Sequence, residues 1–357
     1  MDPNVVIDRL MSHALCADDD GRLALVAATV CATPIPSGAV EERRRLHGMW
    51  RAKAELLKLE SQPAQRSPEW HAMRNEMITA SDVAQAIGEG KFGTQREFFQ
   101  KKVDPGSFVF DANMPPLVWG VKYEPVANTL YSRRNNVRVD EFGLLRHRTV
   151  GHLGASPDGI TENGVMVEIK CPWRRAIDGS VPRQYYIQMQ LQLDCCELDE
   201  CDYFEVKFSE YDCEQDFLDD SDSPGAQQLI AGNGLEKGVL VEFMVGAARH
   251  YLYDHESRTT HEALRWKERA LHGGMLPPDA TSVCVTYWRV EQVNALRVYR
   301  DPEFLGETLP IIADVWGKVV AYRLDRALFD DEVLAAKKAR TSRATKPAAA
   351  PVVCLLD

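Results

Sequence analysis

A short segment near the middle of the chain alternates strictly between hydrophobic and polar positions. The period of two over residues 165–170 predicts a β-strand. Just before it, Asn163-Gly164 predicts a tight hairpin turn, because both residues readily adopt positive φ. The hairpin returns the chain so that Asp158 faces the strand. One strand face carries Val165, Val167 and Ile169, and the other Met166, Glu168 and Lys170.

The remaining pattern predicts a mixture of helices and strands. Helical spacing and capping signals predict helices over residues 40–59, 83–87, 117–135, 184–193 and 309–328. Another helix is predicted to begin at Ser67-Pro68-Glu69. In the helix over 309–328, Pro310 is expected in the first turn. Strands are predicted over 137–145, 165–170, 201–208, 239–243 and 283–290. Residues 1–35 predict one or two short helices around the acidic turn at 18–21. The fold class expected is α/β (α+β), with a largely antiparallel mixed sheet flanked by helices.

Composition restricts the class of protein. The chain of 357 residues is 45% hydrophobic and 27% charged, which is typical of a soluble globular protein. Its apolar runs are shorter than a membrane span requires, and its first residues lack the features of a secretory signal. Nine scattered cysteines favour a reducing, intracellular compartment. The cluster Cys195, Cys196, Cys201 and Cys213 lacks zinc-site spacing and is expected to be core thiols.

The net charge of −11 counts against a protein that coats nucleic acid indiscriminately. A local basic groove remains compatible with DNA binding, because the field of the cleft decides it. Basic residues are concentrated between residues 100 and 185, although each is equally compatible with a solvated surface position. They are Lys101, Lys102, Arg133, Arg134, Arg138, Arg146, His147, Arg148, Arg174 and Arg175.

The central hairpin carries candidate chemistry. Two carboxylates, Asp158 and Glu168, and the amine of Lys170 on a rigid β-scaffold can bind Mg²⁺ and handle a water that attacks a phosphodiester. The alternative is an ordinary surface strand whose Glu168–Lys170 pair is a solvated salt bridge. The Ser-Pro-Asp-Gly turn at 156–159 favours the site.

Six motifs occur in the order found in a known group. They are Trp70-His71-Ala72-Met73-Arg74, Ile78-Thr79-Ala80-Ser81-Asp82, Trp119-Gly120-Val121-Lys122-Tyr123-Glu124, Ser156-Pro157-Asp158-Gly159, Glu168-Ile169-Lys170-Cys171-Pro172 and Gln188-Met189-Gln190. Over residues 66–210 the chain resembles the lambda exonuclease (YqaJ-like viral recombinase) family, which implies a restriction-endonuclease-like PD-(D/E)XK core. Segments 287–290, 300–302 and 309–316 are similar to versions carried by large DNA viruses.

The resemblance implies roles for particular residues. Asp158, Glu168 and the backbone carbonyl of Ile169 would bind a catalytic Mg²⁺, and Glu124 would support a second ion or its water. Two ions are expected, and Mn²⁺ can substitute. Lys170 would orient or help deprotonate the attacking water, with its pKa lowered by the metal.

A second group of residues matches positions for the substrate. Gln188 corresponds to the glutamine of the late helical motif and is expected in the catalytic site, the alternative being a packed helix amide. Arg74, Ser81 and Ser156 match positions that hold a terminal 5′-phosphate. The alternatives are a helix cap for Ser81 and a surface salt bridge for Arg74.

The function expected is a Mg²⁺-dependent 5′-to-3′ exonuclease on double-stranded DNA. It would leave 3′ single-stranded ends for viral DNA recombination or genome processing. A structure-specific or nicking endonuclease of the same fold stays open, as does a non-catalytic DNA-binding module, which Asp158, Glu168 and Lys170 disfavour. A carboxylate-pair glycosidase explains neither Lys170 nor the arginine-rich surroundings.

The domain organisation expected has four parts. Residues 1–65 form a helical N-terminal extension, 66–225 the nuclease core, 226–335 the C-terminal part of the nuclease domain, and 336–357 a disordered basic tail. The tail is expected to solubilise the protein, the alternative being nuclear import or DNA tethering. The resemblance also implies double-stranded DNA as partner, a single-strand annealing protein, a homotrimer and no membrane, in the host nucleus or cytoplasm if the protein is viral.

Overall fold

The computed structural model describes residues 2–13, 20–107, 111, 113–221 and 228–332. The predicted acidic turn at 18–21 lies partly outside these residues, and the predicted basic tail at 336–357 lies wholly outside them. Within the described part, no helix combines the length and apolar character that crossing a bilayer requires.

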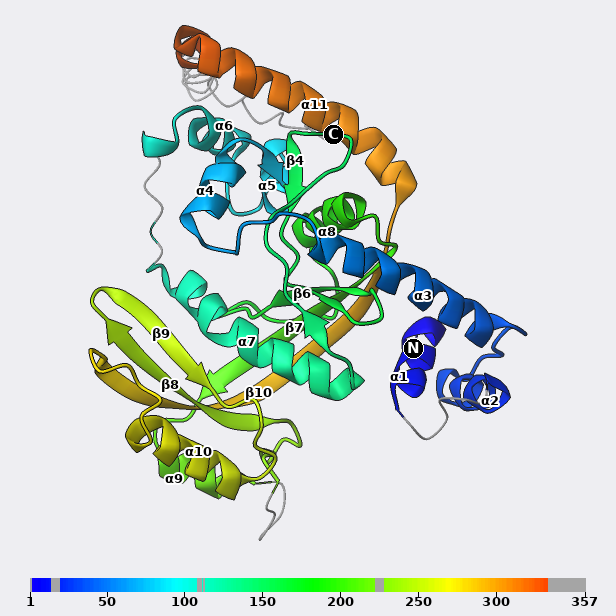
Figure 1. Cartoon of the computed structure of the whole chain (residues 1–357), viewed down its shortest axis with the longest axis vertical. Helices are drawn as coiled ribbons and strands as arrows, with labels where there is room; N and C mark the ends of the chain where they lie inside the picture. Colours follow the sequence, from blue (N-terminus) through cyan, green and yellow to red (C-terminus); the bar gives the residue numbers. More distant parts are fainter. Residues whose placement is uncertain (1, 14–19, 108–110, 112, 222–227, 333–357) are drawn as a thin grey trace, which may run out of the picture.

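A seven-stranded mixed sheet forms the centre of the molecule (Figure 1). Its strand order is β2 (Val139–Asp140), β5 (Gly159–Thr161), β6 (Met166–Lys170), β7 (Glu200–Glu210), β10 (Thr281–Tyr299), β8 (Lys237–Val245) and β9 (Ala248–Tyr253). Only the β6–β7 pair among these is parallel. A smaller sheet joins β1 (Ile78–Thr79), β4 (Leu153–Ala155) and β3 (Leu145–Arg146). The α/β (α+β) class with a mixed, largely antiparallel sheet is therefore confirmed.

Strand β6 is covered on both faces. Parallel neighbours need a crossover, and helix α8 (Arg183–Cys196) supplies it between β6 and β7. On the α8 side, Met166 packs with Met189 in one core cluster. On the other side, Ile169 packs with Tyr123 of helix α7 (Pro115–Asn135) in a second cluster. The polar residues of β6 are consequently held in a protein interior, where their partners must be supplied by the fold.

The hairpin before β6 forms as predicted. Gly164 has φ of +80° and donates its N–H to the Thr161 carbonyl at 2.8 Å, which closes the β5–β6 turn. The turn lies against helix α3 (Ala39–Lys58), because a Cβ added at Gly164 would be 2.3 Å from the Cβ of Trp50. Glycine is therefore required here both by its backbone conformation and by close packing.

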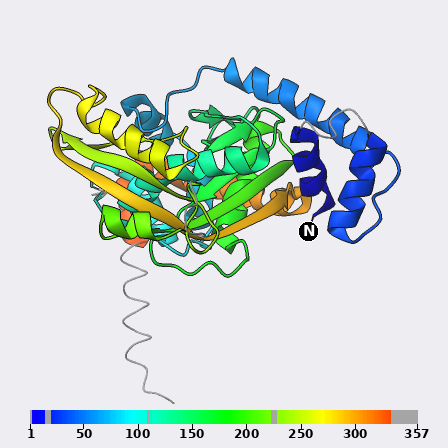
Figure 2. The ribbon, with the colours of Figure 1, turned by 90° about the horizontal axis from the view of Figure 1, so that it is seen from below.

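The N-terminal extension docks on the sheet through buried charges. Helices α1 (Pro3–Ser12), α2 (Asp20–Cys31) and α3 lie at the opposite end of the molecule from β8 and β9 (Figures 1 and 2). Arg43 of α3 pairs with Asp8 of α1 at 2.6 Å and with Glu200 of β7. Arg297 of β10 joins the same group through Asp8 and Glu200. Four nearly buried charges thus compensate one another.

The other helices cover the two ends of the sheet. Helices α4 (Pro68–Asn75), α5 (Ala80–Ala86) and α6 (Gln95–Val103), with the short η1 (Pro105–Ser107), pack near α8 and the long α11 (Pro302–Leu324). Helices α9 (Glu214–Asp219) and α10 (Thr260–His272) pack on β8 and β10. The predicted helices at 40–59, 83–87, 117–135 and 184–193 are confirmed within a few residues at their ends, and the helix predicted to start at Ser67-Pro68-Glu69 begins at Pro68.

Two predictions of local structure are wrong. Segment 137–145 is not one strand, because the chain bends at Gly143. The Gly143 N–H donates to Gln62 Oε1 at 2.6 Å, and the Leu144 N–H donates to the Pro63 carbonyl at 3.1 Å. Pro310 lies inside α11 rather than in its first turn. The helix begins earlier because Asp301 caps it by accepting from Phe304 N at 3.0 Å.

Candidate active site

Asp158, Glu168 and Lys170 converge at the end of β6. Asp158 immediately precedes β5, and its Oδ2 accepts a hydrogen bond of 2.7 Å from the Ile169 backbone N–H. Glu168 and Lys170, two residues apart on the strand, form an ion pair with each other. The hairpin register therefore brings together the three side chains that the sequence singled out.

The carboxylate of Glu168 is fully buried and accepts hydrogen bonds on both of its oxygens. Gln188 Nε2 donates to its Oε1 at 2.7 Å, and Gln192 Nε2 donates to its Oε2 at 2.8 Å. The two glutamines are four residues apart on α8 and so lie on one helix face. The predicted Gln188 is thus beside the carboxylates. Gln192 was missed, although its spacing from Gln188 was a readable signal.

The site concentrates negative charge in a poorly hydrated position. Burial raises the pKa of Asp158 well above its ordinary value, and the charges of Glu168 and Glu124 raise it further. Burial likewise raises the pKa of Glu124. Burial would lower the pKa of Lys170, but Glu168 and Asp158 outweigh it and raise that pKa. In this arrangement the ammonium neutralises Glu168, and the lowering of the Lys170 pKa by a bound metal stays a prediction.

A hollow of about 420 Å³ opens beside these carboxylates. Asp158, Ile169 and Glu124 line it, Glu124 projecting from α7. The segment after α3 completes the wall: Arg66 Nη2 lies 3.4 Å from Glu124 Oε2, and Gln65 donates to the Pro157 carbonyl at 3.1 Å. Sequence reasoning missed Gln65 and Arg66, because nothing local relates them to residues some 60 to 90 positions away.

The donor set fits a hard divalent cation. Among the described residues no three Asp, Glu, His or Cys side chains form a ready metal cluster. The oxygens available are the carboxylates of Asp158 and Glu168 and the carbonyl of Ile169, and hard oxygen donors are what Mg²⁺ prefers. Burial and the neighbouring carboxylates raise the pKa values of Asp158 and Glu124 in spite of the positive charges of Lys170 and Arg66, and a cation beside them would favour their charged forms.

Arg74, Ser81 and Ser156 form a second cluster around Trp70. Arg74 Nη2 donates to Ser81 Oγ at 3.0 Å, and its guanidinium lies 4.3 Å from the Trp70 ring centroid. Trp70 Nε1 donates to Ser156 Oγ at 3.0 Å. Because Ser156 is two residues before Asp158, the cluster adjoins the carboxylates. Ser81 is exposed, and the N-cap position of α5 belongs to Thr79, so Ser81 is not the helix cap that was considered as its alternative role.

A buried carboxylate balances the cations behind this cluster. Asp82 is 4% exposed and lies 2.9 Å from the ammonium groups of both Lys101 and Lys102. Burial would raise the pKa of Asp82, but these lysines hold it well below its ordinary value. The buried Lys102 therefore supports the cluster from within, and the partly exposed Lys101 is paired with the same carboxylate.

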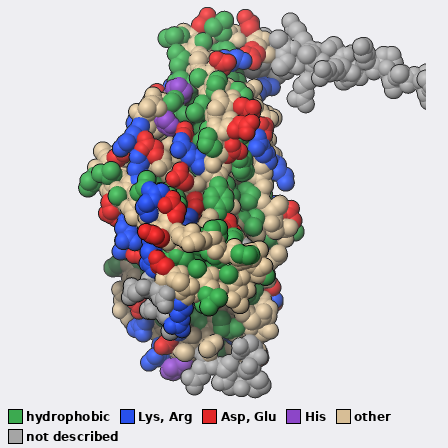
Figure 3. Space-filling model, turned by 90° about the vertical axis from the view of Figure 1, so that its right-hand side faces the viewer, with side chains coloured by type: hydrophobic (Ala, Val, Ile, Leu, Met, Phe, Trp, Pro, Cys, Tyr) green, Lys and Arg blue, Asp and Glu red, His purple; other side chains and the backbone are tan. Residues whose placement is uncertain are grey.

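Most of the other basic residues between 100 and 185 are paired with carboxylates. The pairs are Arg134–Glu236, Arg138–Asp140, His147–Asp194, Arg148–Glu197 and Arg175–Glu205. On the face shown in Figure 3, Lys and Arg side chains are interspersed with Asp and Glu side chains. Charge alone therefore does not mark a DNA path on these parts of the surface.

Comparison with known sequences agrees with the geometry. Residues 69–199 match the model of the YqaJ-like viral recombinase domain. An uncharacterized protein of Acanthamoeba polyphaga mimivirus is 30% identical over 311 residues, 76% of this chain and 55% of that protein. A protein of African swine fever virus is 26% identical over 157 residues, 36% of this chain and 45% of that protein. The chain thus spans about half the length of the curated relatives it matches.

Solved structures include similar chains. An alkaline exonuclease from Laribacter hongkongensis is 19% identical, with 77% of this chain and all of that one covered and a TM-score of 0.43. A phage-related exonuclease from Haemophilus somnus is 12% identical, with 73% and 96% covered and a TM-score of 0.36. The match to residues 69–199 confirms the predicted resemblance to the YqaJ-like family over that part of the chain. The restriction-endonuclease-like PD-(D/E)XK core is what that resemblance implies.

Proposed function

We propose that this chain, whose residues 69–199 match the YqaJ-like viral recombinase domain, is a metal-dependent deoxyribonuclease. It would digest one strand of double-stranded DNA from the 5′ end and leave a 3′ single strand for viral recombination or genome processing. The observation that carries the proposal is the convergence of Asp158, Glu168 and Lys170 beside a hollow that Asp158 and Ile169 line.

Asp158, Glu168 and the Ile169 carbonyl would hold Mg²⁺, and Glu124 would support a second ion through water; Mn²⁺ can replace either. When bound, the metal supplies a Lewis acid for the phosphodiester and a water of lowered pKa. Gln192 fixes the Glu168 carboxylate from behind. The Ile169 N–H fixes Asp158 in the same way. These contacts hold the acceptor oxygens in place before substrate arrives.

Lys170 would orient the attacking water or help to deprotonate it. Its ammonium contacts Glu168 and lies 5.1 Å from the Tyr185 ring centroid, so the side chain is held on two sides. A fixed positive charge at this position also stabilises charge that develops on the phosphate.

Arg74, Ser81 and Ser156 would bind the terminal 5′-phosphate. A guanidinium and two hydroxyls offer several donors to one anion. The stacking of Arg74 on Trp70 limits the freedom of the guanidinium before binding. Proximity of this cluster to Asp158 is consistent with cleavage close to the 5′ end.

By the resemblance, the chain would assemble as a homotrimer around DNA in a reducing compartment, the host nucleus or cytoplasm. It would deliver the 3′ strand to a single-strand annealing protein. Sedimentation of the full chain would report the assembly. A monomer at micromolar concentration would remove the trimer from the proposal.

Digestion of end-labelled linear duplex in Mg²⁺ tests the activity and its direction together. Asp158→Asn is expected to abolish cleavage while DNA binding in EDTA persists. Asp212→Asn, the same change at an exposed position away from the site, is the matched control. Cleavage by Asp158→Asn at the wild-type rate would contradict the site. Digestion of covalently closed circles would instead favour an endonuclease of the same fold.

A further inference from the structure

Three adjoining hollows follow one side of α7. The first is the hollow at the carboxylates. The second, of about 360 Å³, shares Pro125, Asn128 and Glu141 with it. The third, of about 470 Å³, shares Arg133 and Arg258 with the second. The three hollows therefore adjoin one another in a row, called the path below, that leads from the candidate active site to a cavity lined by β8 and the loop before α10.

Helix α7 lines the whole path with one face. Glu124, Asn128 and Ser132 are spaced four residues apart, and Arg133 follows at the far end. The nine steps of 1.5 Å from Glu124 to Arg133 span about 14 Å. At roughly 3.4 Å per stacked nucleotide, that length corresponds to about four nucleotides of one strand. The path is thus scaled to a short run of DNA.

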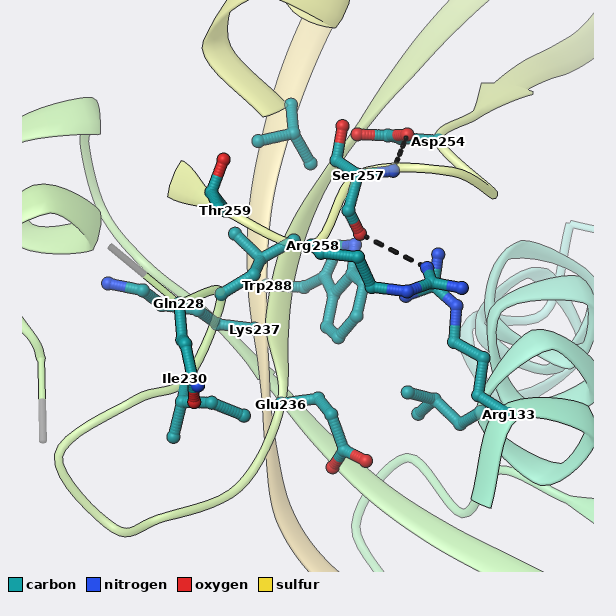
Figure 4. Close-up of a pocket in the computed structure, with 14 residues that line it drawn as sticks. Arg133, Gln228, Ile230, Glu236, Lys237, Asp254, Ser257, Arg258, Thr259 and Trp288 are labelled. Atoms are coloured by element: carbon teal, nitrogen blue, oxygen red, sulfur yellow. Dashed lines mark hydrogen bonds between the residues drawn. The ribbon is translucent and has the colours of Figure 1, made fainter. Parts of the chain in front are cut away.

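Two arginines stand where the second hollow meets the third. Figure 4 shows the guanidinium groups of Arg133 and Arg258 together at this opening. Arg133 donates to the His255 carbonyl at 2.6 Å, and Arg258 donates to the Glu256 carbonyl at 3.0 Å. Burial lowers the pKa of Arg133, and the charge of Arg258 lowers it further. Two like charges at one opening fit an anion between them.

The cavity behind the arginines offers unmet hydrogen-bonding groups of both kinds. Within the described part of the chain, Trp288 Nε1, Arg133 Nε and Asp254 Oδ2 are buried atoms without a hydrogen-bond partner. Trp288 is only 6% exposed and lines the cavity. Glu236, also in the lining, is engaged by Arg134. A nucleobase edge carries both donors and acceptors, and a phosphate suits the arginine pair.

We propose that this cavity binds one nucleotide of a DNA strand, with its phosphate between Arg133 and Arg258 and its base beside Trp288 and Asp254. The strand would follow α7 between the cavity and the carboxylate hollow. This inference rests on the proposed nuclease function for the origin of the strand. The same chemistry would suit a free mononucleotide, but the row of adjoining hollows favours a strand.

Binding of a fluorescein-labelled twelve-residue thymidylate oligonucleotide in EDTA tests the cavity without cleavage. Arg258→Ala is expected to weaken binding about tenfold and to reduce the salt dependence by about one phosphate contact. Trp288→Phe, which removes the indole N–H, is expected to weaken binding about fivefold at unchanged salt dependence. Arg265→Ala removes an exposed positive charge from α10 outside the cavity and is expected to bind as the wild type does.

The outcomes separate this inference from the function. If Arg258→Ala and Arg265→Ala bind alike while the wild type cleaves DNA and Asp158→Asn does not, the cavity proposal falls and the nuclease stands. If free thymidine 5′-monophosphate displaces the oligonucleotide at a concentration similar to that of unlabelled oligonucleotide, the strand path is refuted. Urea unfolding of Trp288→Phe, compared with that of the wild type, checks that weaker binding does not come from loss of the fold. Because Arg258 is exposed, Arg258→Ala tests the cavity independently of any change in the core.

Discussion

Gln192 is expected to act as a positioning residue for Glu168. Gln192→Ala removes one hydrogen bond of 2.8 Å from a carboxylate that is 0% exposed. A hydrogen bond to a charged group contributes about 1.5–3 kcal/mol. Because Lys170 and Gln188 still hold the other oxygen, the lower limit applies. With about 1.4 kcal/mol per factor of ten, the rate of cleavage is expected to fall about tenfold.

The assay is the initial rate of nucleotide release from 5′-phosphorylated linear duplex across a Mg²⁺ titration. A loosened Glu168 is expected to raise the Mg²⁺ concentration for half-maximal rate as well as lower the maximum. Gln190→Ala is the matched control. Gln190 is buried on the same helix, but its amide donates to the Tyr299 carbonyl and accepts from Asp301 N–H. The Gln190→Ala protein should lose stability but keep the wild-type dependence of its cleavage rate on Mg²⁺.

Two results would refute this reasoning. One is a Gln192→Ala protein with the wild-type rate and Mg²⁺ requirement. The other is an equal loss of activity in Gln192→Ala and Gln190→Ala that follows their unfolding free energies in urea. The second result would mean that the glutamine serves only the packing of α8.

Further predictions concern the contacts that the N-terminal helices make with the rest of the chain. Burial raises the pKa of Asp8, but hydrogen bonds from Arg43 outweigh it and hold that pKa below its ordinary 3.8. The stabilisation that ionised Asp8 gives to the folded protein is therefore complete above about pH 4 and is lost as pH falls further. Hydrogen exchange should show α1 detaching in acid. An unchanged α1 at pH 2 would contradict this. Gly164→Ala is expected to destabilise by about 2–5 kcal/mol through strain and collision with Trp50. Gly179→Ala, at the same φ but in open space, should cost only about 1–2 kcal/mol in urea unfolding; equal losses would refute the packing argument.

The sequence was most informative where local patterns coincide with the fold. Asn163-Gly164 and the period of two after it are enough to place Glu168 and Lys170 on a hairpin strand. Capping residues such as Ser67, which accepts from Trp70 N at 3.1 Å, likewise set helix starts by purely local chemistry. These features depend on neighbours within a few residues, which the sequence displays directly.

Features set by distant contacts could not be predicted in this way. The bend at Gly143 depends on the backbone of Pro63, eighty residues earlier, which replaces the strand ladder. The start of α11 was different, because Asp301-Pro302 was a readable cap followed by a first-turn proline. The ion group around Arg43 joins four elements and has no local pattern.

The segment joining α3 to α4 has a practical consequence for shortened versions of the protein. A fragment beginning at residue 69, where the family match starts, would lack Gln65 and Arg66, which close the wall beside Glu124. It would also leave the Gly164 turn without the Trp50 surface against which it rests. The matched family domain is therefore smaller than the part of the chain that must be expressed to test the proposed cleavage.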